Sequence, residues 1–124
     1  MLFLRREFFM ALLLTLGVLA AGQFQSGYAQ ANRPALYEFG AGHCISCKDM
    51  EKVIAELKTT LGDKVEFRMI YADKEKPLFQ QYKIMLIPTQ VFLNAEGKEV
   101  DRHVGALTKD QVLAKLKELK FITN

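Results

Sequence analysis

Apolar and polar residues follow each other in a pattern that predicts short strands and helices after residue 31. Residues 35–39 form an apolar run that ends at Gly40-Ala41-Gly42, which indicates a strand followed by a turn. Apolar residues then recur at helical spacing, which predicts a one-faced helix that begins near Cys44 and stops at Gly62. These residues are Met50, Val53, Ile54, Leu57 and Leu61.

The rest of the chain continues with strands and shorter helices. The pattern predicts strands at 64–71, 88–93 and 98–104 and a short helix at 75–82. Thr108 and Gln111 form a capping box that starts a last helix. The order β-α-β-α-β-β-α predicts one α/β domain, about Arg33 to Phe121, in which the first three strands pair in parallel because helices separate them.

The first 31 residues have the pattern of an export signal. Arg5 and Arg6 precede the uncharged run 8–21, which as a helix would span roughly 21 Å, less than the ~30 Å core of a membrane. Ala29-Gln30-Ala31 fits a signal peptidase site, so we expect residues 1–31 to be removed and residues 32–124 to form the mature domain. Cleavage after Ala29, a twin-arginine route and an uncleaved signal that anchors the protein are the alternatives.

Charge and cysteine content narrow the function classes. The 124 residues include 17 Lys+Arg and 14 Asp+Glu, and this balance does not fit a nucleic-acid binder. The two cysteines, Cys44 and Cys47, are too few for a multi-bridge scaffold or a four-cysteine zinc site.

The spacing and position of the two cysteines predict thiol–disulfide chemistry. Cys44 opens a helix, where unpaired amides and the helix dipole stabilise a thiolate, so we expect it to be the attacking nucleophile. Cys47 lies one turn later and can resolve a mixed disulfide. A weakly stabilising structural bridge or a metal site shared between two chains stays open, whereas zinc within one chain would need both His43 and His103. Lys48 after the second cysteine argues against haem attachment.

Three motifs in this order resemble the thioredoxin superfamily, from about Pro34 to Leu119. They are the strand–C-x-x-C–helix unit, Ile84–Thr89, which resembles the cis-proline loop, and Gly105–Lys109, which resembles the late glycine turn. Residues 88–100 look especially like small exported thioredoxin-like proteins of bacteria and archaea. The resemblance implies a minimal thioredoxin-like α/β fold, with a four-stranded mixed sheet flanked by helices and without the first strand and helix of thioredoxin.

The resemblance also implies roles for single residues. Pro88 would be cis and packed against the disulfide, although a trans bond is the commoner case for proline, and the backbone of Ile87 would pair with an extended substrate. The expected substrate-binding residues are Ile45, Met85, Ile87 and Gly105. No cofactor beyond the Cys44–Cys47 couple is expected.

Glu38 is the other candidate catalytic residue. It shares a strand face with Leu36, so we expect it to be buried with a raised pKa, and a solvated strand end is the alternative. By resemblance it would move the proton of the resolving cysteine, with Met69 in place of the lysine that accompanies the family's aspartate.

Two positions bear on the redox direction, one that departs from thioredoxin and one that agrees with its reducing members. His43 replaces the usual tryptophan and, if cationic, would favour the thiolate and make the couple more oxidising, whereas an exposed His43 would have little influence. Ile87 before the proline is typical of reducing members. We expect a monomeric extracytoplasmic reductant of exported disulfide proteins. The resemblance suggests a membrane thiol carrier of the cytochrome-c-biogenesis or disulfide-reductase type as the partner that re-reduces it.

Two other functions remain open at this point. An oxidase or isomerase would use the same cysteines in the opposite direction. A binding module would use Ile45, Met85, Leu86 and Ile87 as an apolar peptide platform and keep the cysteines for structure or metal.

Overall fold

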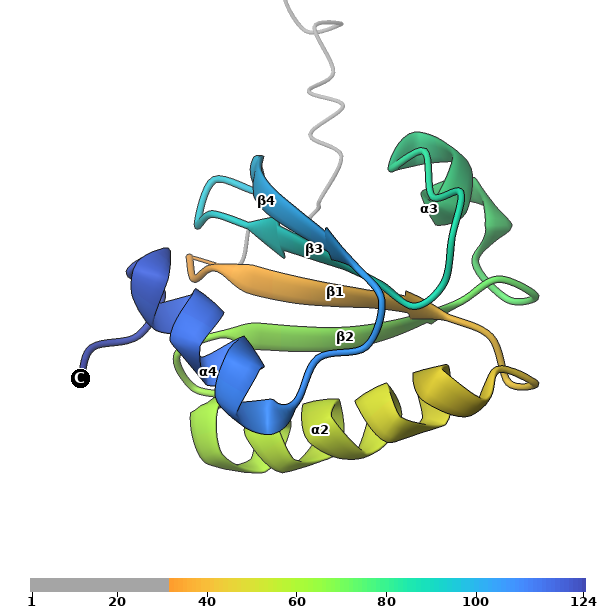
Figure 1. Ribbon diagram of the computed structural model, residues 1–124. Coiled ribbons are helices and arrows are strands. Elements are labelled where there is room, and N and C mark those ends of the chain that lie inside the picture. Colours follow the sequence, from red (N-terminus) through yellow and green to blue (C-terminus); the bar gives the residue numbers. More distant parts are fainter. Residues whose placement is uncertain (1–31) are drawn as a thin grey trace, which may run out of the picture.

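Four strands form one mixed sheet in the order β2-β1-β3-β4 (Figure 1). The computed structural model describes residues 32–124, so the predicted export signal at 1–31 lies outside the described residues. The strands are β1 (Ala35–Gly40), β2 (Glu66–Tyr71), β3 (Thr89–Leu93) and β4 (Glu99–Val104). The helices are α2 (Ile45–Leu61), α3 (Lys76–Gln81) and α4 (Lys109–Glu118). The predicted element order and the mixed four-stranded sheet are confirmed.

The direction of β3 corrects one expectation. β1 and β2 pair in parallel, but β1 and β3 are antiparallel, with Phe39 opposite Thr89 and Ala35 opposite Leu93. A helix as short as α3 spans only about 9 Å, whereas a six-residue strand spans about 20 Å. The chain therefore re-enters the sheet at the end of the strands where β2 ended, and β3 runs back along β1.

One face of the sheet is covered by α2 and α4 (Figure 1). Met50 and Leu57 of α2 and Leu116 of α4 pack with Leu36 and Phe92 of the sheet in one apolar core. The capping box at the start of α4 is formed, since Thr108 accepts from the Gln111 amide and the Gln111 side chain accepts from the Thr108 amide. Both helices thus begin with a side-chain cap and bury the apolar stripe that the spacing predicted.

The opposite face packs against α3 and the segment that follows it. Phe39, fully buried in β1, meets Phe79 edge to face with ring centroids 5.1 Å apart, and Ile70 and Val91 lie in the same apolar group. β1 is therefore covered on both faces, which fixes the environment of every side chain that it carries. Among residues 32–124 no helix is long and apolar enough to cross a membrane.

Candidate active site

The candidate catalytic residues lie together at one end of the strands, where β1 ends and β3 begins. β1 ends at Gly40 and leads directly into the turn before Cys44, while β3 begins at Thr89, in register with Phe39. The antiparallel direction of β3 thus places Pro88 at the same end of the sheet as the start of α2. Two segments distant in sequence meet there.

Cys44 and Cys47 form a disulfide with Cα atoms 5.2 Å apart. Cys44 is the N-cap of α2, and its Sγ accepts a hydrogen bond from the Cys47 amide at 3.3 Å. Ser46 Oγ lies 3.5 Å from the same sulfur and can donate to it. Cys44 is partly exposed, whereas Cys47 is fully buried. This asymmetry is the one that an attacking and a resolving thiol require.

Glu38 is fully buried in β1. It lies on the same strand face as Leu36, which packs against α2. Burial raises its pKa to about 8, and a hydrogen bond from Gln90 opposes part of that rise. Gln90 Nε2 donates to Glu38 Oε1 at 3.0 Å from the facing position of β3, and Met69 is its register partner on β2. The solvated-end alternative for Glu38 is therefore wrong.

Sequence reasoning missed two residues around this carboxyl. Gly40, two positions along β1 from Glu38, packs against Cys47, so the strand links the carboxyl and the buried sulfur. Gln90 is fully buried although it is polar. A polar residue inside an otherwise apolar strand is the only signal in the sequence that pointed to it.

Two hydrogen bonds hold the loop that contains Pro88 in place. The Ile87–Pro88 peptide is cis, as the resemblance implied, and Pro88 is buried. The Pro88 carbonyl accepts from the amide of Gly105, whose φ of 104° favours glycine, at 2.8 Å. Thr89 Oγ1 donates to the Leu86 carbonyl at 2.6 Å.

The backbone of Ile87 stays free for another chain. Within residues 32–124, neither its N–H nor its C=O has a hydrogen-bond partner. An extended peptide could pair there by adding one strand-like contact. The substrate-binding role of Ile87 and the catalytic role of Pro88 stay predictions.

Apolar side chains next to the disulfide and to Pro88 are exposed to solvent. Ile45 after Cys44 is 83% exposed, and Met85 and Leu86 before the proline are 88% and 65% exposed. His43 is exposed as well. In the described part of the chain no three His, Cys, Asp or Glu side chains are grouped so that they could hold a metal ion.

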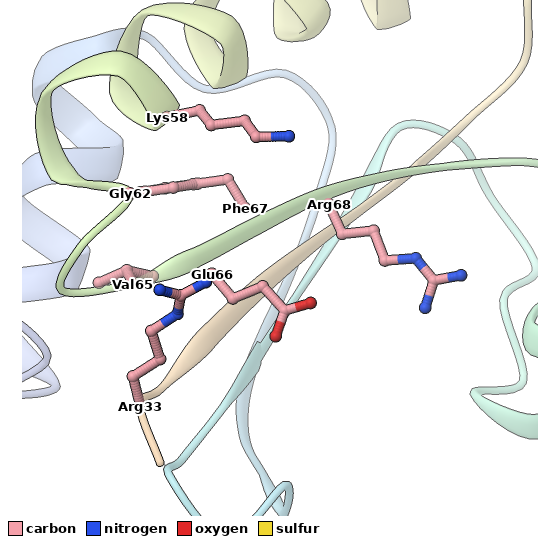
Figure 2. Close-up of a pocket in the computed structure, with 7 residues that line it drawn as sticks. All are labelled: Arg33, Lys58, Gly62, Val65, Glu66, Phe67 and Arg68. Atoms are coloured by element: carbon pink, nitrogen blue, oxygen red, sulfur yellow. The ribbon is translucent and has the colours of Figure 1, made fainter. Parts of the chain in front are cut away.

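A separate hollow lies at the other end of α2, away from the cysteines (Figure 2). Its side chains come from the end of α2, the start of β2 and the segment before β1. They are Arg33, Lys58, Gly62, Val65, Glu66, Phe67 and Arg68. It contains none of the predicted site residues.

Comparison with known proteins places these features in a family. Residues 15–118 match the family model described as thioredoxin. The chain is 34% identical over 95 residues to thioredoxin 2 of Chlorobaculum tepidum, covering 77% of this chain and 86% of that protein. It is 36% identical over 90 residues to the thiol:disulfide interchange protein TxlA of Synechococcus elongatus, covering 71% of this chain and 47% of that protein.

The fold agrees with solved structures as well. The germline-specific thioredoxin Deadhead of Drosophila melanogaster superposes with a TM-score of 0.65 at 26% identity, covering 73% of this chain and 85% of that one. The chain spans about half of the length of the first curated relatives that it matches.

Proposed function

The chain belongs to the thioredoxin family, and from this premise we propose that it is a dithiol reductant of disulfide-containing exported proteins. The observation that carries the proposal is the asymmetry of the cysteine pair. Cys44 is accessible at the N-terminus of α2, while Cys47 is buried beside the strand that holds Glu38. A structural bridge would need neither the exposed sulfur nor the buried carboxyl.

The reaction follows from the positions of these groups. In the reduced protein the Cys44 thiolate attacks one sulfur of a substrate disulfide, a mixed disulfide forms, and the other substrate sulfur leaves as a thiolate. Cys47 then gives its proton to the Glu38 carboxylate and attacks Cys44 Sγ, which releases the second substrate thiolate. Two electrons pass from the dithiol to the substrate, and both substrate thiolates take protons from water.

Glu38 suits the role of proton acceptor because of its pKa. A general base works best when its pKa lies near the working pH, and burial brings the pKa of Glu38 to about 8. Since that value belongs to the disulfide form, Glu38 is mostly protonated there at neutral pH. The disulfide form therefore retains the proton that Cys47 gave up.

The direction of electron flow is the part of the proposal that a single measurement decides. Thioredoxin lies near −270 mV and the strongly oxidising periplasmic relative near −120 mV, a gap of about 7 kcal/mol. An exposed His43 beside the thiolate contributes on the order of 1 kcal/mol, too little to cross that gap. Equilibration of the Cys44–Cys47 couple with glutathione should give a value below about −200 mV, and a value above about −160 mV would assign the protein to the oxidases.

Location and electron supply complete the proposal. The charge and hydropathy pattern of residues 1–31 supports export, and a reductant outside the cytoplasm needs thiols supplied across the membrane. We assign that supply to a membrane thiol carrier of the cytochrome-c-biogenesis or disulfide-reductase type. Expression of the full chain in a bacterium, cell fractionation and N-terminal sequencing should yield an extracytoplasmic protein that begins at Asn32. A full-length cytoplasmic product would overturn the location.

A further inference from the structure

Two buried oxygen atoms lack a partner, and both belong to the same residue pair. Among the buried side-chain nitrogen and oxygen atoms of residues 32–124, only Glu38 Oε2 and Gln90 Oε1 have no hydrogen bond. The other ends of the two groups are already joined by the bond from Gln90 Nε2 to Glu38 Oε1. A buried polar atom without a partner is costly, so two of them on facing residues call for a common explanation.

No other buried polar side chain of residues 32–124 is free to serve these atoms. The buried polar residues of the described chain are Glu38, Gln90 and Thr89, and the Thr89 hydroxyl is bonded to the Leu86 carbonyl. On β2 the register partner of Glu38 is Met69, and α2 contributes Cys47 near Gly40. No charged neighbour contributes to the pKa of Glu38.

One proton accounts for both unpartnered atoms. We propose that Gln90 is a positioning residue whose amide forms a cyclic pair with the neutral Glu38 carboxyl, and this proposal rests on the function proposed above. In this pair Nε2–H of Gln90 donates to Glu38 Oε1, and the protonated Oε2 of Glu38 donates to Gln90 Oε1. A carboxylic acid and a primary amide are complementary in this way, since each offers one donor and one acceptor.

The pair has a direct consequence for the resolving step. While Glu38 is a carboxylate, Gln90 can satisfy only one of its oxygens, and the amide carbonyl has no donor to accept from. When the proton of Cys47 arrives on Glu38, the second hydrogen bond forms. Gln90 therefore fixes the orientation of the carboxyl group, and the second hydrogen bond, which only the neutral carboxyl makes, offsets the preference of the first one for the carboxylate.

The Glu38 carboxyl stretching band tests the pair directly. In the disulfide form at about pH 6, the infrared spectrum of the wild type minus that of Glu38→Gln should show one band, from the buried Glu38 carboxyl. Because a carboxyl O–H that donates lowers the frequency of this band, Gln90→Met should move it to higher frequency. Gln81→Met, an exposed glutamine in α3, is the matched control and should not move it. A band that keeps its frequency in folded Gln90→Met would overturn the proposal.

A second measurement covers the case in which Gln90→Met does not fold. In the unaltered disulfide protein, the side-chain carbonyl carbon of Gln90 should shift in NMR with the same pH midpoint as the Glu38 carboxyl carbon. The shift should be absent in Glu38→Gln. A Gln90 carbonyl that does not respond while Glu38 titrates would overturn the pair.

Kinetics separates positioning from a purely structural role. Gln90→Met should slow resolution of the mixed disulfide by roughly two- to tenfold, the size of one net hydrogen bond, and leave alkylation of Cys44 unchanged. Equal slowing of both steps would assign Gln90 to structure alone. The spectroscopic tests use no substrate, so they are independent of the proposed function. If the wild type lacks reductase activity but its carboxyl band still shifts in Gln90→Met, the result contradicts the proposed function and not the pair.

Discussion

Gly40 lies so close to Cys47 that a β-carbon at position 40 would meet Cys47 Cβ at 3.2 Å and Sγ at 3.3 Å. These approaches are tighter than ordinary van der Waals contacts, and Cys47 is fully buried within α2, so it has little room to yield. The last residue of β1 thus lies directly against the side chain of Cys47.

Gly40→Ala should therefore destabilise the disulfide form by about 1–3 kcal/mol, as overpacking does in well-packed cores. Urea unfolding of the oxidised protein measures the loss. Gly42→Ala is the matched control, because a β-carbon there would meet nothing within 4 Å, and it should change stability by less than about 0.5 kcal/mol. Similar losses in both variants would show that the contact with Cys47 is not the cause.

The pH dependence of stability should carry the signature of Glu38. The pKa of this carboxyl is about 8 in the folded protein against 4.5 for the unperturbed group, so between these values the folded state holds a proton that the unfolded state has lost. Stability contributed by Glu38 is full below about pH 4.5 and falls as pH rises to about 8, by an amount on the order of 5 kcal/mol.

Glu38→Gln should remove this fall while keeping a buried side chain of similar volume. Denaturation from pH 5 to 9 should show the variant gaining on the wild type as pH rises. Glu96→Gln, which removes an exposed carboxylate in the β3–β4 turn, should follow the wild type. Parallel pH curves for wild type and Glu38→Gln would contradict the raised pKa.

The two cysteines should behave differently when each is replaced. Cys47→Ser should accumulate mixed disulfides with substrates, since attack proceeds and resolution does not, whereas Cys44→Ser should accumulate none. In the reduced wild type, a thiol reagent near neutral pH should label the partly exposed Cys44 much faster than the buried Cys47. Mass spectrometry of the labelled peptides reads both results, and equal labelling would contradict the assigned roles.

The exposed apolar residues before Pro88 should matter for peptides and not for small disulfides. Met85→Glu should lower kcat/KM for a disulfide-containing peptide by roughly three- to tenfold through lost apolar contact, with no change for a small aliphatic disulfide. Val100→Glu is the control, since Val100 is also exposed, at 43%, but lies toward the opposite end of the sheet. Equal losses on both disulfides would exclude a peptide contact at Met85.

The sequence predicts most of what depends on local order. The cysteine spacing at a helix start, the Thr108–Gln111 capping box and the apolar stripe of α2 all follow from residues close together in the chain, and the structure bears them out. These features are set by periodicity and by caps, which neighbouring residues determine.

What could not be predicted depends on distant contacts. The antiparallel direction of β3 is decided by where the chain re-enters the sheet after α3, which the hydrophobic pattern does not encode. The partnership of Glu38 with Gln90 needs the register of two strands, because these two residues lie 52 positions apart in the chain. Gln90 therefore looked like an isolated polar residue until the strands were placed together.

The same separation gives the sheet an expected order of assembly. β1, α2 and β2 are consecutive in the chain, and β3 and β4 form a local hairpin, so each unit closes a short loop. The central contact between β1 and β3 joins the two units and closes the longest loop. We expect pulse-labelling hydrogen exchange to show protection in β2 before protection between β1 and β3, and simultaneous protection would contradict this order.

In this order of assembly, docking of the β3–β4 hairpin on β1 would complete the burial of Glu38, because Gln90 of β3 faces the carboxyl. An ionised carboxyl opposes that step, so refolding should slow as pH approaches 8, whereas Glu38→Gln should refold at a rate independent of pH over the same range. The buried carboxyl would thereby make the docking of the hairpin, which completes the domain, sensitive to the acidity of the compartment in which the chain folds.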